Sequence, residues 1–208
     1  MVKNLMFDLG GVIMDIDRNH CVKAFEKLGM ENIDSFLGLY GQKGPFLQLE
    51  EGKISADEFR AEIRKMLPRH VSDEVMDAAF NEFLIGIPVS RLRSLEQLHR
   101  HYPLYMLSNT NPIMMNSRID ACFRADGHDI NYYFDGIVTS YEALSCKPER
   151  RIFDYAARKF GIDPGETLFF DDSQANVEAA VSYGYQAVII RPGEEFKTVL
   201  DNYLSKDL

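Results

Sequence analysis

Short apolar runs, each followed by polar or glycine residues, recur along the chain at 5–7, 103–107, 134–139, 167–170 and 187–190. Apolar runs of this length that end in turn-forming residues are typical of buried β-strands. Between the later runs lie segments with apolar residues at helical spacing, such as the one that carries Ile152, Phe153, Ala156 and Phe160. Strands that alternate with helices in this way predict an α/β protein with a parallel sheet and right-handed crossovers.

The segment from 19 to 83 has a different pattern, because its apolar residues follow helical spacing throughout. Cys21, Phe25 and Leu28 would lie on one face of a first helix. A further helix is predicted after Ser55, because Glu58 stands three residues later and completes a capping box. No strand is predicted here, and we expect a small helical insertion.

Composition narrows the class of partner. Hydrophobic residues make up 46% of the 208 residues and charged residues 26%, which is ordinary for a soluble globular protein. The formal net charge is −9, and without a run of Lys or Arg the chain is a poor candidate for binding nucleic acid or an anionic membrane. No apolar run approaches the ~18 residues that span a bilayer.

The cysteines and the first strand bear on localisation. Cys21, Cys122 and Cys146 are far apart and lack metal-finger spacing, so reduced thiols are expected. The first strand leads directly to Asp8, which does not suit a signal peptide. A cytoplasmic protein is therefore expected.

Polar side chains follow the predicted strands, or stand just before a helix, at four places: Asp8, Ser108-Asn109, Lys147 and Asp171-Asp172. The carboxyl ends of parallel strands meet at one edge of a sheet, where ligands bind. Three carboxylates that meet there would repel one another, and Mg²⁺ suits such a hard oxygen site. The lysine, serine and asparagine would complement a phosphate.

Each of these features also has a plain explanation. The Ser108 motif has ordinary turn chemistry, Asp171 and Asp172 suit the start of a helix, and Lys147 suits a solvated surface. Taken singly, each plain explanation is preferable. Their occurrence together, at successive strand ends, favours a phosphate and metal site.

Four motifs carry a resemblance to a known family: Asp8-Leu9-Gly10-Gly11-Val12, Leu107-Ser108-Asn109-Thr110, Lys147-Pro148-Glu149 and Phe170-Asp171-Asp172. In this order they resemble the motifs of the haloacid dehalogenase-like (HAD) hydrolase superfamily. The resemblance implies a Rossmann-like parallel-sheet core over 1–15 and 87–208, with an inserted α-helical cap over 16–86. The Asp-Leu-Gly opening looks most like the branch that contains the bacterial α-D-glucose-1-phosphate phosphatase.

The resemblance also implies roles for individual residues. Asp8 would be the nucleophile that becomes an aspartyl-phosphate, and Lys147 would neutralise charge between it and the phosphate. Phosphate oxygens would be bound by Leu9, Gly10, Ser108 and Asn109. Mg²⁺ would be held by Asp8, the carbonyl of Gly10, Asp171 and Asp172. Asn176, one helical turn past Asp172, would either steady the acidic pair or be an exposed helix residue.

Position 10 departs from the family pattern. Most phosphatases of this family have a second Asp two residues after the nucleophile, which protonates the leaving group, and here that position is Gly10. Without this acid, a good leaving group is favoured. An anomeric oxygen leaves more readily than an ordinary alkoxide, so a preference for sugar-1-phosphates is expected.

The expected function is a Mg²⁺-dependent phosphatase acting on a small phosphorylated metabolite, most simply a sugar phosphate, as a monomer or dimer. The alternatives are a metal-independent haloacid dehalogenase, against which the acidic pair argues, and a catalytically weak phosphometabolite-binding protein. Arg18, His20 and Tyr40 are candidates to contact a sugar, although each also suits a plain surface or packing position.

Overall fold

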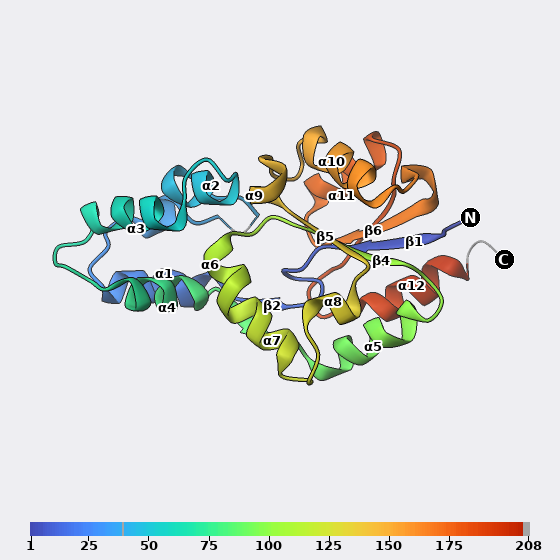
Figure 1. The fold of residues 1–208 in the computed structure, drawn as a ribbon, viewed down its shortest axis with the longest axis horizontal. Helices are drawn as coiled ribbons and strands as arrows, with labels where there is room; N and C mark the ends of the chain where they lie inside the picture. Colours follow the sequence, from blue (N-terminus) through green and yellow to red (C-terminus); the bar gives the residue numbers. More distant parts are fainter. Residues whose placement is uncertain (39, 206–208) are drawn as a thin grey trace.

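The computed structural model describes residues 1–38 and 40–205. A five-stranded parallel sheet has the strand order β5-β4-β1-β6-β7, with β1 at its centre (Figure 1). Its strands are β1 (Asn4–Phe7), β4 (Leu104–Ser108), β5 (Gly136–Thr139), β6 (Thr167–Asp171) and β7 (Gln186–Ile189). The predicted α/β fold with a Rossmann-like parallel sheet is therefore confirmed.

Helices cover both faces of the sheet, and the alternation of side chains along β1 explains why. Leu5 and Phe7 pack in one cluster with the helices α5 (Val89–His99) and α12 (Phe196–Leu204). Met6 points to the other face and packs with α10 (Arg150–Phe160) and α11 (Gln174–Ser182). A central strand buried on both faces needs an unbroken apolar sequence, which β1 has.

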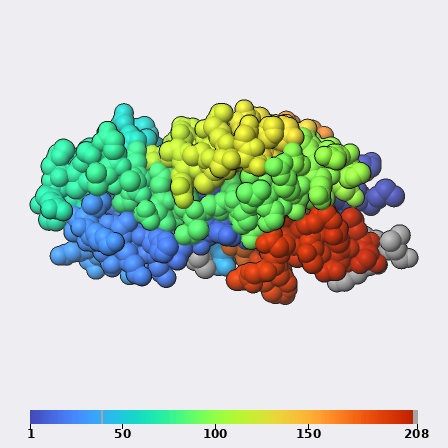
Figure 2. All heavy atoms as spheres, turned by 90° about the horizontal axis from the view of Figure 1, so that it is seen from below, coloured from blue at the N-terminus to red at the C-terminus, as the bar shows by residue number. Residues whose placement is uncertain are grey.

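The two faces are visible in the figures. In Figure 1, α10 and α11 lie above the sheet, while α5 and α12 lie below it. Figure 2 shows α5 and α12 side by side on the lower surface. The remaining helices of this region are α6 (Pro112–Met114), a π-helical turn (Met115–Ile119), α7 (Asp120–Arg124), α8 (Ile130–Tyr133), α9 (Ser140–Ala143) and a 3₁₀ turn (Pro164–Glu166).

Four helices lie apart from the sheet, beyond the carboxyl ends of its strands (Figure 1). They are α1 (Arg18–Lys27), α2 (Gly44–Glu50), α3 (Ala56–Lys65) and α4 (Asp73–Asn81), with a 3₁₀ turn at Ile33–Ser35. Their interior is a cluster of buried rings from Phe25, Phe46, Phe59 and Phe80, and four of the ring pairs meet edge to face. This phenylalanine cluster gives the four-helix segment a core of its own.

The helical segment joins the sheet domain through a short antiparallel ribbon, in which β2 (Asp15–Ile16) pairs with β3 (Leu84–Gly86). Sequence reasoning did not predict β3, which is only three residues long. The ribbon brings both chain crossings together, and we propose that the cap begins and ends there. The division at 16 and 86 stays a prediction.

Local sequence signals set the ends of two helices. The predicted capping box is formed, because the Glu58 amide donates to the Ser55 hydroxyl and the Ser55 amide donates to the Glu58 carboxylate. Gly161 ends α10 in a left-handed conformation at φ +66°. Within the described residues, no helix is long and apolar enough to cross a membrane.

Candidate active site

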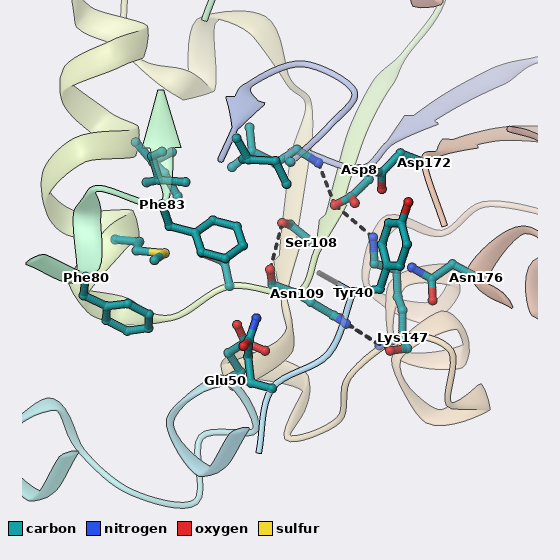
Figure 3. A pocket seen from close by; sticks show the side chains of 18 residues that line it. Asp8, Tyr40, Glu50, Phe80, Phe83, Ser108, Asn109, Lys147, Asp172 and Asn176 are labelled. Carbon is teal, nitrogen blue, oxygen red and sulfur yellow. Dashed lines mark hydrogen bonds and ion pairs between the residues drawn. The ribbon is translucent and has the colours of Figure 1, made fainter. Parts of the chain in front are cut away.

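The predicted site residues converge at the carboxyl end of the sheet. Asp8 follows β1, Ser108 ends β4, and Asp171 ends β6 with Asp172 directly after it. Figure 3 shows Asp8, Ser108, Lys147 and Asp172 around one pocket. Because these strands are parallel neighbours, residues more than 160 positions apart in the sequence are brought together.

Lys147 lies at the centre of this group and is completely buried. Its Nζ is 2.9 Å from Asp8 Oδ1 and 2.7 Å from Asp171 Oδ2. Burial by itself would lower the pKa of Lys147, but the carboxylates of Asp171 and Asp8 more than offset this and raise it. Lys147 is therefore a fixed positive charge beside Asp8, as a group that neutralises a phosphate should be.

Asp171 is the most firmly held of the three carboxylates. Besides Lys147, its Oδ1 accepts hydrogen bonds from the Ser173 amide at 2.8 Å and from Asn176 Nδ2 at 3.0 Å. Asn176 is 6% exposed, so its side chain belongs to the site and not to the surface of α11. Asn176 thus orients Asp171, which is the arrangement that one of the two sequence interpretations expected.

The acidic groups fit a divalent cation. One oxygen each from Asp8, Asp171 and Asp172 lie within 4.8 Å of one another. Burial, with a further contribution from neighbouring carboxylates, raises the pKa of Asp8 to about 7 and that of Asp172 to about 6, although Lys147 opposes both shifts. One lysine thus leaves the negative charge partly uncompensated. Mg²⁺, which prefers carboxylate oxygens, would supply the missing positive charge.

Gly11 leaves room for this cluster. It has φ +73°, and a Cβ at this position would lie 2.1 Å from Asp172 Oδ2. Gly10 differs, because its φ is outside the left-handed region and a Cβ would meet only the Ile16 side chain at 3.5 Å. The backbone therefore requires glycine at position 11 but does not require it at position 10.

The residues expected to bind phosphate all line the pocket: Leu9, Gly10, Ser108 and Asn109. Ser108 is only 2% exposed. The Leu9 amide donates to Asp8 Oδ1 at 2.7 Å, so it holds the carboxylate in place. Phosphate binding by these groups stays a prediction.

The side chain of Asn109 pairs with the backbone of Lys147. Its Nδ2 donates to the Lys147 carbonyl at 2.9 Å, and its Oδ1 accepts from the Lys147 amide at 2.8 Å. Both polar atoms of the side chain hold the Lys147 backbone in position, and phosphate binding by Asn109, which also lines the pocket, stays a prediction. The sequence could not show this pairing, because the two residues are 38 positions apart.

The cap forms the opposite wall of the pocket. Figure 3 shows Phe80, Phe83 and Glu50 there, whereas Tyr40 is drawn beside Asp172; Gln42 also lines the space. Of the three residues proposed from sequence to contact a sugar, only Tyr40 lines this pocket. Arg18 instead binds the Leu37 carbonyl and Asp34, and His20 lies near Asp17. Sequence reasoning missed Glu50, since a Glu near a helix end is ordinarily exposed.

Comparison with known proteins decides the family. The model of the haloacid dehalogenase-like hydrolases matches residues 2–184. The chain belongs to the haloacid dehalogenase-like hydrolase family. Within it, the D-ribitol-5-phosphate phosphatase of Bacteroides thetaiotaomicron is 37% identical over 200 residues, covering 96% of this chain and 97% of the relative. The predicted HAD-type phosphatase, a phosphoric monoester hydrolase, is thereby confirmed.

Solved structures extend this result. A HAD family enzyme from Bacteroides thetaiotaomicron, in complex with magnesium and inorganic phosphate, has a TM-score of 0.90 at 39% identity, covering 96% of this chain and 99% of that one. The prediction of Mg²⁺ as cofactor is confirmed by such HAD neighbours. An L-2-haloacid dehalogenase from Xanthobacter autotrophicus, with a TM-score of 0.64 at 16% identity over 98% of this chain and 83% of that one, shares the fold alone. None of these relatives is named as a glucose-1-phosphate phosphatase, and that closer resemblance stays a prediction.

Proposed function

We propose that this HAD hydrolase releases phosphate from a sugar or sugar-alcohol phosphate through an aspartyl-phosphate on Asp8. The observation that carries the proposal is the position of Asp8, whose carboxylate has Lys147 at 2.9 Å and lies in the cluster with Asp171 and Asp172. A buried carboxylate in contact with a fixed lysine suits attack on a phosphoryl group.

Each residue of the site has a separate role in the reaction. Asp8 attacks phosphorus, and the Leu9 amide, which donates to Asp8 Oδ1, directs the other oxygen toward the pocket. Lys147 stabilises negative charge on the phosphoryl oxygens in the transition state, with Asp171 and Asn109 holding it in position. Asp8, Asp172, Asp171 and the Gly10 carbonyl would hold Mg²⁺. When bound, this ion adds positive charge at the phosphoryl group.

The second half-reaction returns the enzyme to its starting state. Water attacks the phosphorus of the aspartyl-phosphate, phosphate leaves, and the Asp8 carboxylate is regenerated. The cap covers the pocket with Phe80, Phe83 and Tyr40, which limits access of bulk water.

Substrate choice follows from the relatives and from the pocket. The relative named for D-ribitol-5-phosphate makes phosphorylated pentitols the first class to test, and sugar-1-phosphates, favoured by Gly10, are the second. The cap side of the pocket offers Tyr40, Gln42 and Glu50 to hydroxyl groups of a polyol or sugar.

A screen of phosphorylated metabolites tests the proposal. Phosphate release should be found with sugar or sugar-alcohol phosphates, should stop reversibly in EDTA, and should be weakened together with metal dependence in Asp172→Ala. Full activity in metal-free buffer, or release of halide from 2-haloacids, would instead support the dehalogenase alternative. Tight binding of phosphorylated metabolites without turnover would support the binding protein.

A further inference from the structure

Gly10 leaves a chemical problem unsolved. Transfer of a phosphoryl group from an alkyl phosphate to Asp8 is fast only if the departing alkoxide receives a proton, and general acid catalysis of such a step is typically worth ~10²–10⁴-fold. Gly10 has no side chain to provide it. Efficient activity of this chain on phosphates of ordinary alcohols therefore requires another proton donor in the pocket.

Few of the residues that line the described pocket can supply that proton. Lys147 is committed to Asp8 and Asp171, and Asp172 belongs to the metal cluster. Tyr40 is 52% exposed, and burial together with Asp172 and Asp171 raises its pKa above the ordinary value of 10.0, so it is a weak acid. The remaining candidate is Glu50.

Glu50 is a carboxyl group in an unusual position. It is the last residue of α2, it is only 8% exposed, and it lines the same pocket as Asp8 and Ser108. Among the described residues its side chain has no hydrogen-bond or ion-pair partner. Neither carboxyl oxygen is completely enclosed by protein atoms. Because Glu50 lines the pocket, its carboxyl group faces that open space. A buried, unpaired carboxyl group beside a ligand site requires an explanation.

Contacts between cap and core hold Glu50 at this place. Gly52, two residues further on, has φ +65°, and a Cβ there would lie 2.4 Å from the Tyr141 carbonyl. The end of α2 therefore lies directly against the core segment that precedes Lys147. This close approach directs Glu50 into the site from the cap, opposite the strand that carries Asp8.

The protonation state of Glu50 suits a proton donor. Burial, and then the charges of Glu51 and Asp8, raise its pKa from 4.5 to about 8, so the carboxyl group is neutral at pH 7. Cys146 is a further ionisable neighbour, and its thiol pKa is raised to about 12 by burial and then by Glu50. A donor is most effective when its pKa lies near the working pH.

We propose that Glu50 is the general acid of this enzyme and takes the place of the Asp that is absent at position 10. This inference rests on the phosphatase function proposed above. As Asp8 attacks phosphorus, the bond from phosphorus to the ester oxygen breaks, its electron pair stays on that oxygen, and the Glu50 proton moves to it. The Glu50 carboxylate then takes a proton from the water that attacks the aspartyl-phosphate. Phosphate is released, Asp8 is again a carboxylate, and Glu50 is again protonated.

The test compares Glu50→Gln with the wild type on phosphate esters of graded leaving-group pKa. The proposal expects a loss of about 10²–10⁴-fold in kcat/KM for alkyl phosphates such as D-ribitol-5-phosphate, with little loss for p-nitrophenyl phosphate. Gly10→Asp in the Glu50→Gln background should restore part of the alkyl activity, because the space at position 10 accepts a side chain. Glu62→Gln, on α3 of the same helical segment, removes a carboxylate that pairs with Lys65 outside the pocket; it is the matched control and should behave as wild type.

The pH profile gives a second readout. The kcat/KM of the wild type for alkyl phosphates should fall as the pH rises through the pKa of Glu50, and this fall should be absent in Glu50→Gln. An equal loss on alkyl and aryl esters would show that Glu50 only binds substrate, and no loss on either would remove it from the reaction; both results overturn the proposal. Hydrolysis of p-nitrophenyl phosphate that depends on Asp8 would leave the phosphatase function intact in either case.

Discussion

The pocket has a core wall, formed by residues at the carboxyl end of the sheet, and a cap wall, formed by residues of the helical segment. The polar groups of these two walls are held differently. On the core wall, Asp171 accepts from Lys147, Ser173 and Asn176, and Asn109 fixes the backbone of Lys147 at both polar atoms. On the cap wall, Glu50 is buried without a partner among the described residues. The groups that act on the phosphoryl group are thus held in position before substrate binds, whereas Glu50 is left unpaired on the side of the pocket that faces the rest of the substrate.

The largest effect is expected from a change in the core wall. Asp8→Asn removes the nucleophile with little change in volume, so kcat should fall by at least about 10²-fold. The fold should persist, because burial disfavours the Asp8 charge and its loss does not destabilise the apo protein. Phosphate release and thermal unfolding of the purified variant measure both. A variant that kept more than a few per cent of wild-type activity would exclude Asp8 as nucleophile.

The two adjacent glycines give a matched pair for a smaller effect. Gly11→Ala places a methyl group against Asp172 and forces an alanine into a left-handed conformation, at a cost of about 1–3 kcal/mol. Mg²⁺ affinity and activity should fall together by roughly tenfold or more. Gly10→Ala should change either by only a few-fold, because its Cβ meets ordinary contacts.

Titration with Mg²⁺, followed through activity and through thermal stabilisation, measures the difference between the two glycine variants. Equal Mg²⁺ affinities for Gly10→Ala and Gly11→Ala would show that the Asp172 carboxylate does not depend on the turn at Gly11.

The smallest effect concerns stability and comes from the cap wall. Below pH 4.5, Glu50 is protonated in both the folded and the unfolded protein. As the pH rises toward its pKa of about 8 in the folded protein, Glu50 ionises in the unfolded chain but stays protonated in the folded one. The free energy of unfolding therefore decreases over this range. Above that pKa the penalty is constant, on the order of a few kcal/mol at most. Glu50→Gln should lack this component, so its stability relative to the wild type should increase between pH 4 and pH 8. Urea unfolding of both proteins at several pH values measures this difference. If the free energies of unfolding of the variant and the wild type changed with pH in parallel, Glu50 would not be buried in solution.

Sequence reasoning succeeded for the core wall because its residues stand at strand ends, where a parallel sheet fixes their meeting point. Asp8, Ser108, Asp171 and Asp172 could be placed together for that reason alone. By contrast, β3, the second strand of the ribbon that links the helical segment to the sheet, is only three residues long, which is too short to show a strand pattern in the sequence.

The cap wall could not be predicted in the same way. Glu50 is buried where the end of α2 lies close to Tyr141, a residue that is distant in the sequence. The pairing of Asn109 with Lys147 is likewise a tertiary contact. Nothing in the local pattern around Glu50 or Asn109 distinguishes these positions from an exposed helix end or an ordinary turn.

The central claim is that the phosphoryl group passes through Asp8. The most direct measurement mixes the Mg²⁺-loaded enzyme with excess phosphate ester, stops the reaction in acid at successive times, and weighs the peptide that contains Asp8. The account predicts that this peptide gains one phosphoryl group in the wild type during turnover and does not gain it in Asp8→Asn. Release of phosphate at the full rate with the Asp8 peptide unmodified at every time, or with the phosphoryl group on another residue, would contradict it.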